Sequence, residues 1–316
     1  MKTVLVTGGA GFIGSHIVDK LIQKKYNVVV FDNLITGKIE FINKKAIFEK
    51  GDVSNRKQFE NVFKKYKFDA IFHIAGQPSI VNAFSDPVLD VNTNFIGTIN
   101  ATMLSLKYGI SRFLYASSMT LYGNPETLPI KENAKPAPIN YYGIAKYASE
   151  RFVHITSERL DLETEFFPTS FRMFNVYGPR QSLTNPYQGV LAIFIGNVLR
   201  HEPITIFGNG KQGRDFVYVE DVANAWVNNI ENKKSYGNVY NIGAGKQTPI
   251  LTLAKIVIKA CGFDPKKYPI VFKPKRSGDQ KFIEADINRA RKDLKFKPNY
   301  SLSKGLKATL EWAKNN

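Results

Sequence analysis

The sequence predicts an α/β fold, with a doubly wound parallel sheet and a smaller, discontinuous α/β domain. Three observations lead to this prediction. Short, nearly continuous apolar runs alternate with segments of helical periodicity over the first 171 residues. A glycine-rich turn joins the first apolar run to the first helical segment. The alternation stops after residue 171, where shorter elements are interrupted by Pro179, Pro186 and Pro203.

The elements expected in the first part follow one another in order. The β-branched and apolar runs predict strands at 3–7, 27–31, 46–50, 70–74, 112–116 and 165–171. The helical patterns predict helices at 11–24, 56–66, 88–107 and 140–160. Because the early strands are apolar throughout, helices should cover both faces of the sheet.

The second part is less regular. Its patterns predict helices at 217–230, 252–260 and 301–314, a strand at 239–242 and an exposed loop at 273–278. We expect one domain from residues 1–171, with 215–245 returning to it, and a second domain from residues 172–214 and 246–316. No low-complexity linker separates them, so the two should pack tightly.

Charge and composition limit the classes of binding partner that the protein can have. The chain has 316 residues and a net charge of +17, of which +10 falls within residues 255–316. Such an excess fits either a polyanion partner or a solvated, lysine-rich surface. No basic motif interleaved with aromatic residues accompanies it, so we expect neither a nucleic-acid nor a membrane partner.

Cysteine and histidine usage point to the compartment and exclude other chemistry. The single cysteine, Cys261, cannot form an intrachain disulfide, and the chain opens without a signal-peptide pattern. We therefore expect a soluble, cytoplasmic protein. The four histidines are scattered without metal-ligand spacing, so no metal site is expected.

The glycine-rich turn predicts a dinucleotide site. Gly8, Gly11 and Gly14 are spaced three apart between the first strand and the first helix. Glycines there let the backbone turn tightly and approach a pyrophosphate, which the N–H groups of the helix N-terminus then bind. A glycine turn that merely packs on the sheet is the alternative.

Polar and small residues at the following strand ends fit the same ligand. Asp32 ends the second strand 18 residues after Gly14, where an acid can bind ribose hydroxyls and repel a 2′-phosphate; this favours NAD over NADP. A turn-forming role is the alternative for Asp32, and also for Asp52, which otherwise could accept the adenine amino group. Small residues at 75 and 76 would let the cofactor pass close to the backbone.

A tyrosine and a lysine mark the expected chemistry. Tyr142 and Lys146 are four residues apart on a predicted helix, with Asn140 as its N-cap, so they share one face. A nearby ammonium favours the tyrosine phenolate, which can then act as a base. The hydroxyl of Ser118, at the end of a strand, can reach the same substrate oxygen, although a turn role is equally compatible.

Seven motifs, in order along nearly the whole chain, carry a family resemblance. They are TGGAGFIG (7–14), FDNL (31–34), HIAGQ (73–77), SSMTLYG (117–123), YGIAK (142–146), RMFNVYGPR (172–180) and RDFVYVEDV (214–222). With them the chain resembles the extended short-chain dehydrogenases/reductases, in the group of NAD-dependent sugar-nucleotide epimerases and dehydratases. Within this group it is most similar to the UDP-hexose 4-epimerases, which implies a Rossmann fold and tightly bound NAD, regenerated in each cycle.

The resemblance implies a role for each matching residue. Tyr142 would be the base, Lys146 its partner on the nicotinamide ribose, and Ser118 a ligand of the reacting oxygen, with Thr120 close by. The implied cofactor residues are Gly8, Gly11, Phe12, Ile13, Gly14, Asp32, Asn33, Asp52, Val53, Ala75, Gly76, Gln77, Asn94, Ser117, Tyr142 and Lys146. The implied UDP-sugar residues are Ser118, Tyr142, Asn175, Val190, Thr205, Phe207, Arg214, Arg276 and Asp279.

Departures from the family patterns narrow the choice among the reactions that the family catalyses. Related dehydratases and decarboxylases carry acidic residues just after the serine, where this chain has Met119 and Thr120, which favours epimerisation. Ile283 stands where residue bulk influences tolerance of an N-acetyl group. We expect 4-epimerisation of a UDP-hexose by a homodimer built on the helices that begin near Val88 and Asn140. A uronate epimerase, dehydratase or decarboxylase, or a non-catalytic NAD-binding scaffold, is the alternative.

Overall fold

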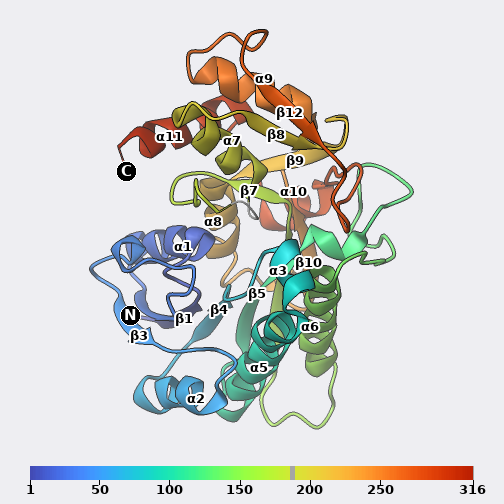
Figure 1. Ribbon diagram of the computed structural model, residues 1–316. Helices are drawn as coiled ribbons and strands as arrows, with labels where there is room; N and C mark the ends of the chain where they lie inside the picture. The colour runs from blue at the N-terminus through green and yellow to red at the C-terminus, as the bar shows by residue number, and fades with distance from the viewer. Residues whose placement is uncertain (186–188, 316) are drawn as a thin grey trace.

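A seven-stranded parallel sheet forms the larger part of the protein (Figure 1). The computed structural model describes residues 1–185 and 189–315. The strand order is β10-β6-β5-β4-β1-β2-β3, and every neighbouring pair is parallel. The strands are β1 (Thr3–Thr7), β2 (Asn27–Asp32), β3 (Ile47–Lys50), β4 (Ala70–His73), β5 (Arg112–Ser118), β6 (Phe167–Met173) and β10 (Asn238–Ile242). The predicted α/β class and parallel sheet are confirmed.

Helices cover both faces of this sheet, as the apolar strands predicted. On one face lie α1 (Phe12–Gln23) and α8 (Val219–Val227), which pack against each other. On the other lie α2 (Arg56–Lys65), α5 (Gly97–Lys107) and α6 (Tyr141–Ser157). Each face has its own apolar core, so the sheet is desolvated on both sides.

The predicted helix at 88–107 is confirmed, because residues 87–107 are helical without a break, but it is not α-helical throughout. The structure has α4 (Pro87–Val91), a π-helical turn at Asn92–Ile96 and then α5. This wide turn lies where buried Asn94 offers its main-chain oxygen to the hydroxyls of Thr98 and Ser149. Side-chain donors of this kind compete with the regular helical ladder, which apolar periodicity does not reveal.

A smaller α/β region is built from the later chain. Strands β7 (Asn175–Tyr177), β9 (Gly213–Tyr218) and β11 (Gln247–Pro249) form one sheet, and β8 (Ile204–Phe207) pairs with β12 (Ile270–Lys273). The helices α7 (Val190–Leu199), α9 (Ile250–Ala260) and α11 (Leu302–Lys314) enclose a separate apolar core. The predicted helix at 217–230 is wrong at its start, because residues 217–218 continue β9.

The remaining elements are short. They are η1 (Ile39–Phe41), α3 (Ile80–Ser85), η3 (Met119–Tyr122), η4 (Lys233–Ser235) and α10 (Asn288–Leu294). Among the residues that the structure describes, no helix combines the length and apolar character needed to cross a membrane.

Candidate active site

Two clefts adjoin each other at the carboxyl ends of the parallel strands. The first, the cofactor cleft, has a volume of about 180 Å³ and is lined by residues that follow β1, β2, β3 and β4. The second, the substrate cleft, has a volume of about 290 Å³ and lies between the large sheet and the smaller region. Phe12, Ile13 and Pro78 line both clefts, so the two spaces meet there.

The glycine-rich turn at the start of the cofactor cleft requires glycine at two of its positions. Gly8 has φ +70°, and a β-carbon on Gly14 would lie 2.1 Å from the carbonyl oxygen of Gly8. Gly11 is the N-cap of α1 and has no side chain to satisfy the first-turn N–H groups. These groups remain available to an anion, so this cradle fits the pyrophosphate of a dinucleotide.

Asp32 lies at the end of β2 beside this cradle. Its carboxylate accepts the backbone N–H groups of Ala10 at 3.0 Å and Leu34 at 2.8 Å. Burial raises the pKa of Asp32, and these two hydrogen bonds oppose the shift. The turn role and the ribose role are therefore compatible, since each carboxylate oxygen has a second lone pair for a ribose hydroxyl.

Most of the cofactor residues named from the sequence line this cleft. They are Gly8, Gly11, Phe12, Ile13, Gly14, Asp32, Asn33, Val53, Ala75, Gly76 and Gln77. Asp52 does not line it. Its carboxylate accepts the Ser54 N–H and hydroxyl and the Asn33 amide, so it builds the turn that was the alternative for it.

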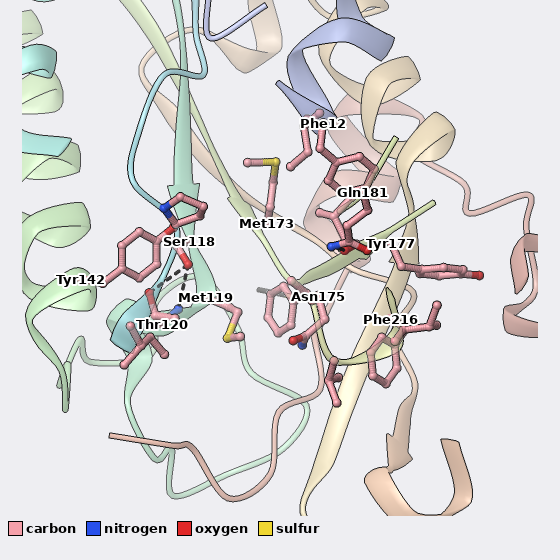
Figure 2. A pocket seen from close by; sticks show the side chains of 18 of the residues that line it. Phe12, Ser118, Met119, Thr120, Tyr142, Met173, Asn175, Tyr177, Gln181 and Phe216 are labelled. Atoms are coloured by element: carbon pink, nitrogen blue, oxygen red, sulfur yellow. Dashed lines mark hydrogen bonds between the residues drawn. The ribbon is translucent and has the colours of Figure 1, made fainter. Parts of the chain in front are cut away.

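The hydroxyls that were predicted to be catalytic come together in the substrate cleft. Ser117, Ser118, Thr120 and Tyr142 all line the substrate cleft, and Figure 2 shows Tyr142, Ser118 and Thr120 side by side. The Thr120 hydroxyl donates to the Ser118 oxygen at 2.9 Å. Asn140 caps α6 by accepting the Gly143 N–H at 2.8 Å, as expected, and this cap fixes the helical turn that carries Tyr142.

Lys146 lies behind this group, on the same face of α6. Its ammonium donates to the Ala116 carbonyl at 3.0 Å and is 6.0 Å from the centre of the Tyr142 ring. Neither Lys146 nor buried Asn94 lines a cleft, although the Asn94 side-chain oxygen and Lys146 Nζ both lie near Gly76.

The ionisation of this pair differs from the expectation. Burial raises the pKa of Tyr142 to about 12, although its hydrogen bond with Ser118 lowers it. Burial also lowers the pKa of Lys146 to about 8, against the attraction of Asp90. Desolvation of the phenolate thus outweighs the expected lowering of the Tyr142 pKa.

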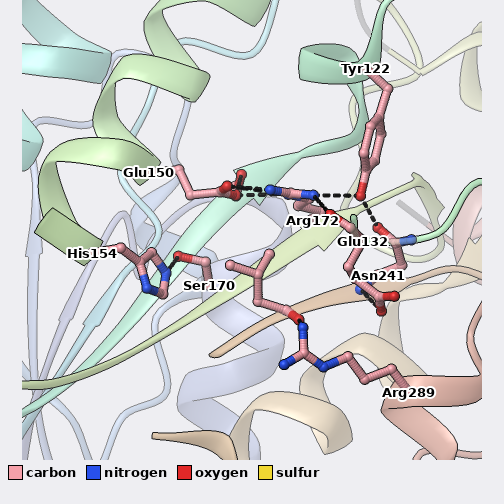
Figure 3. A network of polar contacts seen from close by, with 10 residues as sticks. Tyr122, Glu132, Glu150, His154, Ser170, Arg172, Asn241 and Arg289 are labelled. Carbon is pink, nitrogen blue, oxygen red and sulfur yellow. Dashed lines mark hydrogen bonds and ion pairs between the residues drawn. The ribbon is translucent and has the colours of Figure 1, made fainter. Parts of the chain in front are cut away.

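A buried polar network supports these residues from behind (Figure 3). Glu150 accepts the Ser117 hydroxyl at 2.6 Å and pairs with the Arg172 guanidinium. Arg172 also donates to the Tyr122 hydroxyl at 2.7 Å, which in turn donates to Asn241 at 2.8 Å. The network joins α6, β5, β6 and β10 and so fixes the strand end that carries Ser117. Sequence reasoning did not single out Glu150, since an acid in a helix carries no signal of its distant partners.

The far end of the substrate cleft carries the predicted nucleotide residues in part. Asn175, Val190, Arg276 and Asp279 line it. Arg214 does not, because its buried guanidinium binds the Asp279 carboxylate and the Gln280 carbonyl.

Three further residues named from the sequence lie outside this lining. Thr205 is on β8 away from the cleft. Phe207 lies beneath Arg276, whose guanidinium carbon is 3.7 Å from the ring centre. Ile283 is fully buried in the core of the large sheet and does not line the substrate cleft; its influence on tolerance of an N-acetyl group stays a prediction.

Several lining residues were not predicted. In the substrate cleft they include Ile80, Val81, Gln181 and Phe216, and in the cofactor cleft Ile35 and Thr36. Ile35 and Thr36 directly follow the predicted Asp32, so proximity in sequence could have identified them. The others come together only through the tertiary fold. Within residues 1–185 and 189–315, no cluster of three His, Cys, Asp or Glu side chains could hold a metal ion.

Comparison with known proteins gives concordant matches. Residues 4–243 match the model of the NAD dependent epimerase/dehydratase family. A putative UDP-glucose 4-epimerase of Methanocaldococcus jannaschii is 38% identical over 99% of both chains. A crystal structure of UDP-glucose 4-epimerase with UDP-glucose from Thermotoga maritima superposes with a TM-score of 0.93, at 39% identity over 99% of both chains. The Thermus thermophilus UDP-glucose 4-epimerase complex with NAD gives a TM-score of 0.91 at 32% identity, again over 99% of both chains.

Proposed function

Because the chain belongs to the NAD dependent epimerase/dehydratase family, we propose that it catalyses the NAD-dependent 4-epimerisation of a UDP-hexose. The substrate would be the UDP-glucose/UDP-galactose pair or its N-acetylated counterpart. The observation that supports this most directly is the grouping of Tyr142, Ser118 and Thr120 in the substrate cleft, which meets the cofactor cleft with its glycine cradle at Phe12, Ile13 and Pro78.

The residues of the cofactor cleft fit NAD. The cradle that a β-carbon on Gly14 would fill accommodates a pyrophosphate, and Asp32 disfavours a 2′-phosphate. Asn33, Val53 and the segment 75–77 would hold the adenosine and nicotinamide portions. When bound, NAD supplies the acceptor, and later the donor, of the hydrogen at sugar C4.

The chain's own residues carry out the proton transfer. Tyr142 takes the proton of the 4-hydroxyl and returns it after the 4-keto sugar has turned its other face toward the cofactor. Ser118, oriented by Thr120, donates a hydrogen bond to the reacting oxygen. The Lys146 ammonium stabilises the negative charge on the Tyr142 oxygen and binds the nicotinamide ribose.

The distribution of carboxylates around the substrate cleft favours epimerisation over dehydration. Among the described residues that line this cleft, Asp279 is the one carboxylate, and it is paired with Arg214. Met119 and Thr120 follow Ser118 at the sugar end, so no acid lies there to protonate a leaving hydroxyl. Arg276, Asp279, Asn175 and Val190 would then contact the nucleoside diphosphate part of the substrate, with Arg214 paired to Asp279 outside the lining.

Product identification tests this function. Purified protein incubated with UDP-glucose should produce UDP-galactose, followed by NMR, without added reductant because NAD is regenerated in each turnover. A panel with UDP-N-acetylglucosamine, UDP-glucuronate and dTDP-glucose defines the sugar and the nucleotide. No interconversion of any UDP-hexose, or loss of water or carbon dioxide from the sugar, would contradict the proposal.

The division of the chain and its assembly are part of the same proposal. Residues 1–171, with 215–245, would bind NAD, and residues 172–214 and 246–316 the nucleotide sugar. The separate apolar cores support this division only in part, because residues 283–296 pack in the core of the large sheet and Phe216 and Tyr218 in the core of the smaller region. A homodimer would form through exposed apolar residues on α4 and α6, namely Val88, Leu89, Val91, Ile144 and Ile155. Light scattering of the purified protein gives its mass, and a monomer at micromolar concentration would contradict the dimer.

The single cysteine supports a cytoplasmic location.

A further inference from the structure

One short segment lies between the substrate cleft and the start of the catalytic helix. Residues 276–281, here called the recognition segment, contribute Arg276, Ser277 and Asp279 to the cleft lining. The segment is tied to the smaller region by the Arg214–Asp279 ion pair. It is tied to the loop after η3 by the Lys281 N–H, which donates to the side-chain oxygen of Asn124 at 2.9 Å.

Asn140 joins this segment to α6. Its side-chain oxygen accepts the Gly143 N–H at 2.8 Å and so caps the helix. Its side-chain nitrogen donates to the carbonyl oxygen of Gly278 at 3.2 Å. Only 2% of Asn140 is exposed; its capping hydrogen bond is buried, and its hydrogen bond to Gly278 is partly buried.

The packing around this hydrogen bond is close. Gly278 has φ +71°, and a β-carbon there would lie 2.9 Å from the Phe84 ring and 3.1 Å from the Asn140 β-carbon. The Phe84 ring packs edge-on against Tyr141, the first residue of α6, with ring centres 5.0 Å apart. A shift of the recognition segment therefore bears directly on the first turn of the helix, which carries Tyr142.

Capping alone does not require asparagine. Serine and aspartate cap helices as well as asparagine does, and this chain uses Ser79, Asp86 and Ser301 to cap α3, α4 and α11. Of these three residue types, only asparagine accepts with one side-chain atom while donating with another at this reach. The second contact of Asn140 is thus separable from its cap.

We propose that Asn140 is a positioning residue that couples occupation of the substrate cleft by a nucleoside diphosphate to the placement of Tyr142. The proposal rests on the proposed function only for the identity of the ligand. Arg276 and Asp279 bind the ligand and so fix the position of the recognition segment. The Gly278 carbonyl in that segment accepts a hydrogen bond from Asn140. Asn140 in turn caps the helical turn that carries the base.

Substitutions that keep the cap but remove the donor test this coupling. In Asn140→Ser the cap remains, so thermal stability and kcat should stay within about twofold of wild type. Loss of one hydrogen bond that leaves a buried acceptor should raise both KM for the UDP-hexose and Kd for UDP roughly three- to tenfold. Asn140→Asp should raise them further, because a carboxylate would face the Gly278 carbonyl. Asn140→Ala should also lower kcat, because the cap is lost.

Two further variants complete the design. Asn55→Ser removes the same amide from the cap of α2, which lies outside the lining of the substrate cleft, and should leave KM and Kd for the UDP ligands unchanged. Gly278→Ala leaves the α6 cap intact but displaces the segment, and should weaken UDP binding as Asn140→Ser does. UDP binding is measured by calorimetry on the NAD-loaded protein. Protection by UDP against tryptic cleavage after Lys275 and Lys281 reports the segment directly, and it should weaken in Asn140→Ser.

The outcomes separate this proposal from the proposed function. Wild-type KM and UDP affinity in Asn140→Ser would overturn the coupling, as would a fall in kcat with no change in UDP binding. Absence of UDP binding to the wild-type protein would also overturn it. If UDP binds and the variants weaken it as expected while no UDP-hexose is interconverted, the coupling stands and the proposed function fails.

Discussion

The cofactor cleft and the substrate cleft are assembled in different ways. Most residues around the cofactor cleft come within a few positions of the ends of four successive strands of one parallel sheet; Leu89 and Thr93, on the helix that follows, are the exceptions. Residues around the substrate cleft come from α1, β5, α6, β7, α7 and the segment before α10. A cleft of the first kind can be predicted from short sequence motifs, whereas one of the second kind forms only when distant segments pack together.

The two regions also differ in how their polar groups are satisfied. In the cofactor cleft, the groups offered to a ligand are mainly backbone N–H groups, which the glycine conformations around Gly8 and Gly14 leave accessible. In the substrate region, charged side chains pair with one another, as Arg214 does with Asp279 and Arg172 with Glu150. Substitutions should therefore affect the two regions separately, except where they meet.

The largest effect is expected at the junction. Tyr142→Phe should lower kcat by about 10²–10⁴-fold, because the base is lost, while NAD and UDP remain bound. Rates from NMR and ligand contents of the purified protein measure this. Tyr141→Phe, at the neighbouring exposed position, is the control and should retain activity. A tenfold or smaller loss in Tyr142→Phe would mean that the two clefts do not share their chemistry at this residue.

A smaller effect should be confined to the cofactor cleft. In Asp32→Asn, an amide NH₂ would face the N–H group of Ala10 or Leu34, and the charge that holds the ribose would be lost. NAD affinity should fall on the order of 10–100-fold, with UDP affinity unchanged. Equilibrium dialysis against both ligands checks this, and Asp52→Asn, outside the cleft lining, is the control. Equal loss of UDP binding would break the separation between the regions.

The smaller region should show a stability effect instead. Asp215 is fully buried and accepts N–H groups from Ala244 at 2.6 Å and from Gly245 and Ala285 at 3.0 Å, which joins two distant loops. Asp215→Asn places an amide NH₂ against one of these donors and should lower the free energy of unfolding by about 1–3 kcal/mol. Denaturant titration measures this. Asp264→Asn, at a turn on the surface, should leave stability unchanged. A loss of NAD affinity in Asp215→Asn at full stability would contradict the assignment.

The pH profile should give the smallest effect. The pKa of Lys146, lowered by burial to about 8, means that its ammonium is present below pH 8 and is lost as the pH rises through 8. We expect kcat to be level near pH 7, to fall by about half near pH 8 and to decrease further above it. Lys146→Arg keeps its charge over this range and should lack this decrease, even if its rate is lower. An identical profile in both proteins would exclude Lys146 as the titrating group.

The same contrast explains what could be read from the sequence. Strand runs and the glycine turn predicted the parallel sheet and most of the cofactor cleft, because each signal is local. The tyrosine, the lysine and the serine were found through their spacing and a family resemblance. Arg214, Thr205 and Phe207 were placed against the substrate by resemblance alone, and the structure puts none of them in the cleft lining. Glu150 escaped prediction because its partners, Ser117 and Arg172, are distant in sequence.

The position of β10 has a consequence for how the chain folds during synthesis. This strand, the edge partner of β6, ends at residue 242, so the ribosome must translate about three quarters of the chain before the sheet can close. Trp226, which packs on Phe72 and Phe171, is likewise translated late. A nascent or truncated chain that ends near residue 171 leaves an unpaired strand edge and an uncovered apolar face, both of which promote aggregation. Expression of the cofactor-binding part alone therefore requires the late strand to be supplied, for example by circular permutation.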